Sequence, residues 1–138
     1  MDEQGKIKRI NESLQNTMTS AIGIEITDVR NEYICGKMPV DERTIQPFGL
    51  LHGGASVALA ETLGSIAGGI RVYSNNEIVV GVEINASHLK SIQKGWVMGK
   101  AIPIRIGKKI HVWEIKITNE KNELICISRL TLAVIKKK

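Results

Sequence analysis

The sequence predicts one α+β domain in which an antiparallel sheet wraps around one long central helix. The chain has 138 residues, a length typical of a single domain spanning 1–138. One long segment, 53–70, has helical character, and it is preceded by two strand-like runs and followed by four. Two strands, one helix and four strands in that order are typical of an antiparallel sheet with its helix packed on one face.

The strands and a second helix are predicted from the spacing of apolar residues. Ile7, Ile10 and Leu14 lie at helical spacing, which predicts a short amphipathic helix over 6–17. Runs rich in Ile and Val predict six strands, at 22–30, 33–40, 77–90, 95–107, 109–118 and 123–135. Pro103 lies inside one of these runs and predicts an edge position or a bulge there.

The composition excludes several classes of protein. Apolar residues make up 43% of the chain and charged residues 24%, which excludes a disordered chain, a collagen and a disulfide scaffold. No apolar stretch reaches the roughly 18 residues of a membrane span, and no apolar run follows the charged N-terminus. Cys35 and Cys126 lie alone in apolar segments and are expected to be buried free thiols. We therefore expect a cytoplasmic protein with no membrane partner.

The positive charges are unevenly distributed along the chain. The net charge is +5, yet the segment between Glu83 and Glu114 has no acidic residue. Its basic residues are Lys90, Lys94, Lys100, Arg105, Lys108 and Lys109. A segment of one sign favours a phosphate-bearing partner, and the alternative is a solvated strand face. With five aromatic residues and no recognisable nucleic-acid-binding motif, the chain is expected to have no nucleic-acid partner.

The predicted long helix has a single ionisable residue, Glu61, among residues that are apolar or small. Such a helix is expected to be buried nearly all round rather than amphipathic. An unpaired carboxylate is costly in those surroundings, so its presence favours nucleophilic or general-base work. An exposed glutamate, or one paired with a distant lysine, is the alternative.

The start of the same helix lacks the usual capping residue. His52, Gly53 and Gly54 lie where a Ser, Thr, Asp or Asn cap is expected. Bare backbone N–H groups at a helix N-terminus favour negative charge and could stabilise an oxyanion. Two glycines could equally serve a tight turn.

The spacing of the two features predicts a homodimer. Eight residues separate Gly53 from Glu61, which is a rise of about 12 Å along a helix. Groups that act on one carbonyl must both lie within roughly 3 Å of it. Two antiparallel helices across a two-fold axis would bring Gly53 of one chain to Glu61 of the other. Ser65, one turn beyond Glu61, is then placed to hold a water or a leaving group.

The residues around these features resemble a known family. Residues 46–56 read Gln-Pro-Phe-Gly-Leu-Leu-His-Gly-Gly-Ala-Ser, and residues 60–65 read Ala-Glu-Thr-Leu-Gly-Ser. As a set they resemble the signature of hotdog-fold acyl-CoA thioesterases, of the phenylacetate-pathway and 1,4-dihydroxy-2-naphthoyl-CoA hydrolase type. The resemblance covers almost the whole chain, including 81–88 and 128–132.

The resemblance implies a hotdog fold and hydrolysis of an aryl or other acyl-CoA to the free acid and coenzyme A. It implies that Glu61 is the nucleophile or general base and that the Gly53 N–H is the oxyanion donor. Gln46 and His52 would orient the thioester, and Ser65 would position water. It places coenzyme A along Gly81, His88, Leu89, Lys90, Ser91, Arg105, Ile106, Gly107, Lys108, Lys109 and Ile110. It implies dimers or dimers of dimers, hence a homotetramer, and no cofactor apart from the coenzyme A of the substrate.

Other enzyme classes have less support. The chain has no Gly-x-Ser-x-Gly elbow and no Gly-x-Gly-x-x-Gly or Walker sequence. Its histidines, at 52, 88 and 111, are too scattered to predict a metal site, and His111 is expected to be structural. The alternatives are a non-catalytic acyl-CoA binding module, which would not need Glu61, and a hotdog-fold dehydratase.

Overall fold

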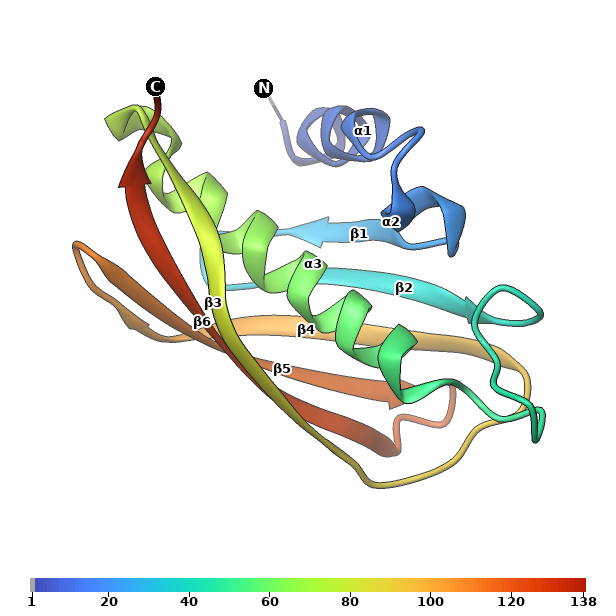
Figure 1. The fold of residues 1–138 in the computed structure, drawn as a ribbon. Helices are drawn as coiled ribbons and strands as arrows, with labels where there is room; N and C mark the ends of the chain where they lie inside the picture. The colour runs from blue at the N-terminus through green and yellow to red at the C-terminus, as the bar shows by residue number, and fades with distance from the viewer. Residues whose placement is uncertain (1) are drawn as a thin grey trace.

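The computed structural model of the protein describes residues 2–138 and shows an antiparallel six-stranded sheet curved around one long helix (Figure 1). The strand order is β1-β2-β4-β5-β6-β3, and α3 lies across the concave face of the sheet (Figure 1). The elements are α1 (Glu3–Ser13), α2 (Met18–Ala21), β1 (Glu25–Val29), β2 (Ile34–Val40), α3 (Gly53–Val72), the 3₁₀ turn η1 (Tyr73–Asn75), β3 (Glu77–His88), β4 (Gly95–Ile106), β5 (Ile110–Asn119) and β6 (Leu124–Lys136). The predicted fold class and order of elements are confirmed.

The element boundaries differ from the predicted ones mainly at the N-terminus. The first helix begins at Glu3 because the Asp2 side chain accepts a hydrogen bond from the Gly5 N–H at 2.8 Å and caps it. Its apolar residues Ile7 and Ile10 pack against the core as expected. Pro103 lies at a bulge between β4 and β5, where the ladder tolerates its missing N–H.

One face of α3 forms the centre of the core. Leu59 and Leu63, with no exposed surface, belong to the same buried cluster as Ile115 and Leu130 of the sheet. The expectation that this helix is buried nearly all round is wrong for the single chain. The sheet covers only one side of α3, and Glu61, at the margin of that side next to β3, is half-buried.

The two edges of the sheet differ in whether their backbone groups are hydrogen-bonded by another part of the chain. At the β1 edge, the side chain of Asn11 in α1 accepts from the Ile26 N–H at 2.8 Å and donates to the Ile26 carbonyl at 3.0 Å. This pair of bonds satisfies backbone groups that would otherwise invite another strand. At the other edge, β3 has no second strand beside it among residues 2–138, and its Val80 and Val82 are exposed. An edge of this kind can pair with another strand.

The two cysteines are free, as predicted, although their burial differs. Cys126 is buried, and burial raises the pKa of its thiol. Cys35 is only half-buried, so the prediction of a buried thiol is wrong for this residue, but desolvation still raises its pKa. Both thiols are therefore held in their protonated, unreactive form at neutral pH.

His111 is a structural histidine, as expected from its place on a strand. It is 1% exposed, lies edge-on to the ring of Trp113, and its Nδ1 accepts from Trp113 Nε1 at 3.5 Å. Burial lowers the pKa of His111, and the charge of Arg71 on α3 lowers it further, while Glu77 on β3 acts in the opposite direction. The imidazole is thus neutral in the folded protein near pH 7.

We expect the stability of the protein to fall as the pH drops below about 6.5, the ordinary pKa of histidine. There the unfolded chain binds a proton at His111 that the folded chain does not, so acid favours unfolding. Replacing His111→Asn, which keeps an acceptor near the Nδ1 position, should flatten this part of the pH profile. Urea unfolding between about pH 5 and about pH 7.5, at one protein concentration, measures the difference. Equal slopes for the two proteins would contradict the prediction.

Candidate active site

The loop before α3 orients Gln46. Its main chain closes a turn, in which the Gln46 N–H donates to the Leu50 carbonyl at 2.8 Å. Its side-chain Oε1 accepts from the Phe48 N–H at 2.6 Å and from the Leu50 N–H at 3.3 Å. Because Oε1 is held by two backbone donors, the Nε2 amide of Gln46 is the end left to donate to a ligand.

The N-terminus of α3 is capped, contrary to the expectation of bare N–H groups. The His52 Nδ1 accepts from the Gly54 N–H at 2.7 Å, so a histidine takes the place of the usual capping residue. The neutral His52 ring therefore has its proton on Nε2. The Gly53 N–H has no hydrogen-bond acceptor within the described residues 2–138. One donor, rather than several, is left for a ligand at this helix end.

A pocket opens at the start of α3 and contains six of the predicted site residues. Its volume is about 350 Å³. The predicted residues in its lining are Gln46, Gly53, His88, Leu89, Lys90 and Ser91. The His88 ring lies against Gly53, since a Cβ on Gly53 would come within 2.9 Å of His88 Nε2. Only glycine lets the ring and the backbone approach so closely.

Glu61 lies over Gly81 of the edge strand β3. A Cβ on Gly81 would fall 2.5 Å from Glu61 Oε2, so the missing side chain makes room for the carboxylate. Within residues 2–138 the Glu61 carboxylate has no ion-pair partner. The alternative prediction, that Glu61 pairs with a distant lysine, is therefore wrong for the single chain. Ser65 follows one turn later on the same half-buried face of α3. Glu61, Gly81 and the Ser65 face thus form a second group, separate from the pocket.

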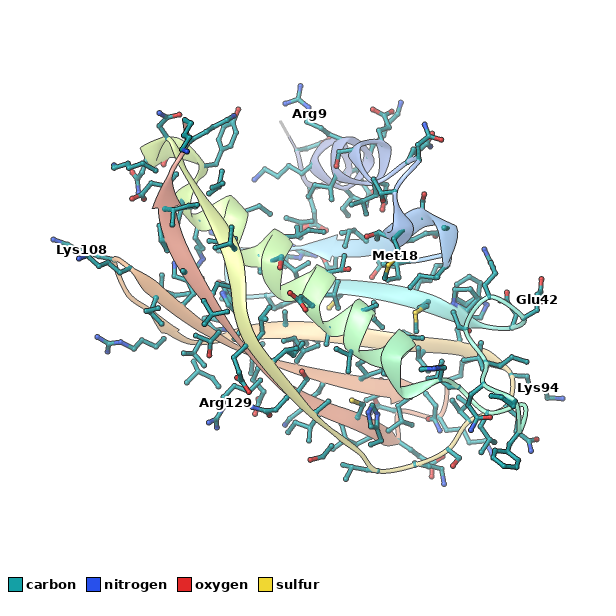
Figure 2. The ribbon with its side chains drawn as sticks, in the orientation of Figure 1. Arg9, Met18, Glu42, Lys94, Lys108 and Arg129 are labelled. Atoms are coloured by element: carbon teal, nitrogen blue, oxygen red, sulfur yellow. The ribbon has the colours of Figure 1, made fainter. Side chains whose placement is uncertain are left out.

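The structure does not bring all predicted residues together in one chain. α3 is continuous from Gly53 to Val72, so about 12 Å of helical rise separates Gly53 from Glu61. The hairpin 105–110 joins β4 to β5 at the opposite end of the sheet from Lys94, as the labelled Lys108 and Lys94 show (Figure 2). The hairpin is therefore remote from the pocket of its own chain.

Two of the basic residues in the segment without acidic residues are engaged within the fold. Lys90 forms an ion pair with Glu123 at 3.6 Å, and Lys100 lies over the ring of Tyr33 at 4.2 Å. The remaining positive charges are divided between the two ends of the sheet. Within residues 2–138, no cluster of three or more His, Cys, Asp or Glu side chains is placed to share a metal ion. No helix in the same range is long and apolar enough to cross a membrane.

The pocket also contains residues that the sequence did not single out. Ser56 and Ile125 line it, and both are buried. Phe48, Leu50, Leu51 and Leu59 could from the sequence line an acyl pocket or belong to the core. Leu50 and Leu51 line the pocket, Leu59 belongs to the core, and Phe48 is 86% exposed. A serine near the start of a helix rich in Gly and Ala gives no periodic signal, so only the fold reveals that Ser56 faces this pocket.

Comparison with known proteins places this geometry in a family. The family model described as the thioesterase superfamily matches residues 48–126, which include the end of the Gln46 loop, α3 and the edge strand. This chain belongs to the thioesterase superfamily. The 1,4-dihydroxy-2-naphthoyl-CoA hydrolase of Escherichia coli is 43% identical over 129 residues, which are 94% of each chain.

Solved structures show the same fold over nearly the whole chain. A thioesterase from Haemophilus influenzae superposes with a TM-score of 0.92 at 48% identity, covering 94% of this chain and 90% of the other. A Staphylococcus aureus thioesterase, solved as a Glu-to-Ala and as a Gln-to-Ala variant, superposes with a TM-score of 0.82 at 38% identity. The match covers 86% of this chain and 98% of the Glu-to-Ala chain, and 85% and 97% for the other variant. The protein is a hotdog-fold thioester hydrolase.

The close contact at Gly81 gives a testable consequence for this enzyme. A Gly81→Ala substitution should displace the flexible end of Glu61 without disturbing the core, because the atom it meets is the carboxylate oxygen. We expect kcat for thioester hydrolysis to fall by about tenfold or more, with an unchanged melting temperature. In a Glu61→Gln background the same substitution should change kcat little. Unchanged kcat in the single variant would show that the carboxylate position is not critical.

Proposed function

We propose that this protein hydrolyses an acyl-CoA thioester to the free acid and coenzyme A, with Glu61 as the nucleophile or general base. The observation that carries the proposal is the unpaired, half-buried Glu61 carboxylate, seated against Gly81 with room made for it. Coenzyme A enters as part of the substrate, and the chemistry proposed here uses no separate cofactor. The reaction needs water, one carboxylate and donors for the oxyanion.

The start of α3 would polarise the thioester. The free Gly53 N–H is the proposed donor to the carbonyl oxygen, where negative charge develops as the carbonyl is attacked. The Gln46 Nε2 amide and the His52 Nε2–H are the proposed donors that orient the thioester, since their acceptor atoms are already engaged. If Glu61 attacks the carbonyl carbon, the thiolate of coenzyme A leaves, and water then hydrolyses the resulting mixed anhydride to the free acid. If Glu61 instead deprotonates a water, that water attacks and the same thiolate leaves. Ser65 would hold the water beside the carboxylate.

Each site would be shared by two chains. Because about 12 Å of helical rise separates Gly53 from Glu61, the two residues of one helix cannot both contact the same thioester carbonyl. Antiparallel pairing of two β3 edges across a two-fold axis would bring the His88 end of one strand to the Glu77 end of the other. The exposed Val80 and Val82 on this edge, and the covered β1 edge, support this mode of pairing.

The same two-fold arrangement accounts for the remote hairpin. Within one chain, the Lys109 carbonyl accepts from the Val134 N–H at 2.8 Å, so the hairpin lies at the Glu77 end of the sheet. In the proposed dimer, the hairpin of one chain would approach the His88–Ser91 segment of its partner. Coenzyme A would then lie between residues 88–91 of one chain and Gly81 and Arg105–Ile110 of the other. We propose a dimer as the minimal active unit, a dimer of dimers as the assembly, and the cytoplasm as its location.

The relatives support the roles proposed for Gln46 and Glu61. The exchanged glutamine and glutamate of the Staphylococcus aureus thioesterase lie fifteen residues apart in that chain. Gln46 and Glu61 have the same separation. The Escherichia coli relative acts on a CoA thioester of an aromatic acid, which favours an aryl group among the acyl groups of this substrate.

Replacing Glu61→Gln should lower kcat by at least ~10², because the amide keeps the shape but can neither attack the carbonyl nor take a proton. Release of the thiol from an acyl-CoA, followed spectrophotometrically, measures the loss. Equilibrium dialysis of the same variant should still show acyl-CoA binding. Near-normal turnover would remove Glu61 from the reaction and favour a binding module or another mechanism.

A mixed dimer tests whether the site is shared. One inactive variant is Glu61→Ala, and the other combines His52→Ala with Gln46→Ala at the opposite end of α3. If equal amounts are unfolded, mixed and refolded at random, about half of the dimers are mixed and roughly a quarter of all sites are restored. Each variant refolded alone is the control. Activity no higher than the mean of the controls, with mixed dimers confirmed by mass, would place the site within one chain.

A further inference from the structure

Three exposed lysines lie at the end of β6, where Lys136 is the last residue of the strand and Lys137 and Lys138 follow it. Lys136 is paired with Glu77 across the β3–β6 ladder, with its Nζ 3.7 Å from Oε2. The Lys137 N–H donates to the Asn76 carbonyl at 3.0 Å, so the backbone after β6 is tied to the residue before β3. Within residues 2–138, neither Lys137 nor Lys138 forms an ion pair. Two positive charges that no carboxylate neutralises are therefore held at this end of the sheet.

The hairpin between β4 and β5 adds positive charge at the same end. Val134 of β6 donates its N–H to the Lys109 carbonyl at 2.8 Å, so the hairpin lies beside the last residues of β6 (Figure 1). In the described part of the chain, the side chains of Lys108 and Lys109 form no ion pair either. The lysines after β6 and those of the hairpin form one basic patch, and a patch of this kind attracts a phosphate-bearing ligand.

In the proposed dimer, the end of β6 lies between the hairpin and residues 88–91 of the partner. The strand order β5-β6-β3 makes β6 the neighbour of β3, which is the strand proposed to pair with its own copy. With neighbouring strands about 4.8 Å apart, the end of β6 would lie about 10 Å from the β3 of the partner, and the β5 end of the hairpin about 15 Å from it. A coenzyme A molecule that contacts both the hairpin and residues 88–91 of the partner therefore passes the end of β6.

We propose that Lys137 and Lys138 bind the nucleotide phosphates of coenzyme A at the site that this chain shares with its partner. The proposal rests on the proposed function and on the dimer that it includes. An ammonium group on a flexible stem can follow an exposed phosphate, and the contact between the two is a charge-assisted one. Because the phosphates lie far from the thioester carbon, the two lysines are expected to lower KM and to leave kcat unchanged.

The experiment compares the wild type with a double variant, Lys137→Gln with Lys138→Gln, on benzoyl-CoA and on benzoyl-pantetheine, which lacks the nucleotide. Glutamine removes both charges and keeps the backbone hydrogen bond to Asn76. At low ionic strength, where exposed charges are screened least, we expect KM for benzoyl-CoA to rise about fivefold in the variant, with kcat unchanged. The kinetics on benzoyl-pantetheine should be the same in both proteins.

A matched variant, Lys6→Gln with Lys8→Gln, removes two exposed charges from α1, which lies at the opposite edge of the sheet from β3. It should keep the wild-type KM. Three results would overturn the role of Lys137 and Lys138: an unchanged KM for benzoyl-CoA in their variant, an equal rise in the matched variant, or an equal rise on benzoyl-pantetheine.

Titration calorimetry with coenzyme A itself separates this proposal from the proposed function. Its Kd should rise about fivefold when Lys137 and Lys138 are replaced, whether or not the enzyme turns over benzoyl-CoA. A wild type that binds coenzyme A but hydrolyses no acyl-CoA would overturn the proposed function, and the change in Kd would still support the two lysines. A Kd that is equal in the variant and the wild type would overturn their role while hydrolysis stands.

Discussion

The rigidity of α3 is the constraint on which the proposed site depends. Hydrogen bonds along its whole length fix the rise per residue, so no side-chain movement brings the Gly53 N–H next to Glu61 of the same chain. The helix instead presents the free Gly53 N–H at its start and the Glu61 carboxylate two turns later. A second helix of opposite direction would complete both proposed sites at once, because a two-fold axis exchanges the two ends. The shared site that we propose thus follows from helix geometry.

The sheet provides the surface for such an arrangement at one edge only. The Asn11 side chain is hydrogen-bonded to the backbone of β1 at one edge, and the exposed apolar residues of β3 lie at the other edge. Gly81 lies between Val80 and Val82 on this strand, under the Glu61 carboxylate. The strand proposed to join the chains is therefore also the strand on which the Glu61 carboxylate lies. The proposed dimerisation and the position of Glu61 would depend on the same few residues.

Much of the fold could be predicted from the sequence because its signals are local. Alternating apolar residues identify the strands, and the long run from Gly53 identifies α3. The capping of this helix by His52 could not be predicted, because histidine is not a usual cap and its role depends on a side-chain rotation. The exposure of one face of α3 was also missed. Composition shows that a face is apolar, but it does not show whether the same chain or another one covers it.

The identity of the candidate site residues could be predicted from the sequence, whereas their contacts are seen only in the folded structure. Gln46, Gly53 and Glu61 are candidates because of their spacing and the family resemblance. The structure adds which atoms of each residue are hydrogen-bonded or paired and which are free. Gln46 is left with a free amide donor, Gly53 with a free N–H, and Glu61 with an unpaired carboxylate. The remoteness of hairpin 105–110 depends on how two strands run across the sheet, which no local pattern specifies.

In the proposed dimer, acyl recognition and chemistry come from opposite sides of the thioester. The pocket and the Gly53 N–H belong to one chain, whereas the carboxylate and Ser65 come from the partner. The pocket is lined by apolar residues such as Leu51 and Ile125 and by polar ones such as Gln46 and Ser91. In the proposed arrangement, the attacking water is held beside Glu61 and Ser65 of the partner, at the boundary between the chains. A change in the pocket alters which acyl group is held, while the group that attacks it stays in place on the other chain.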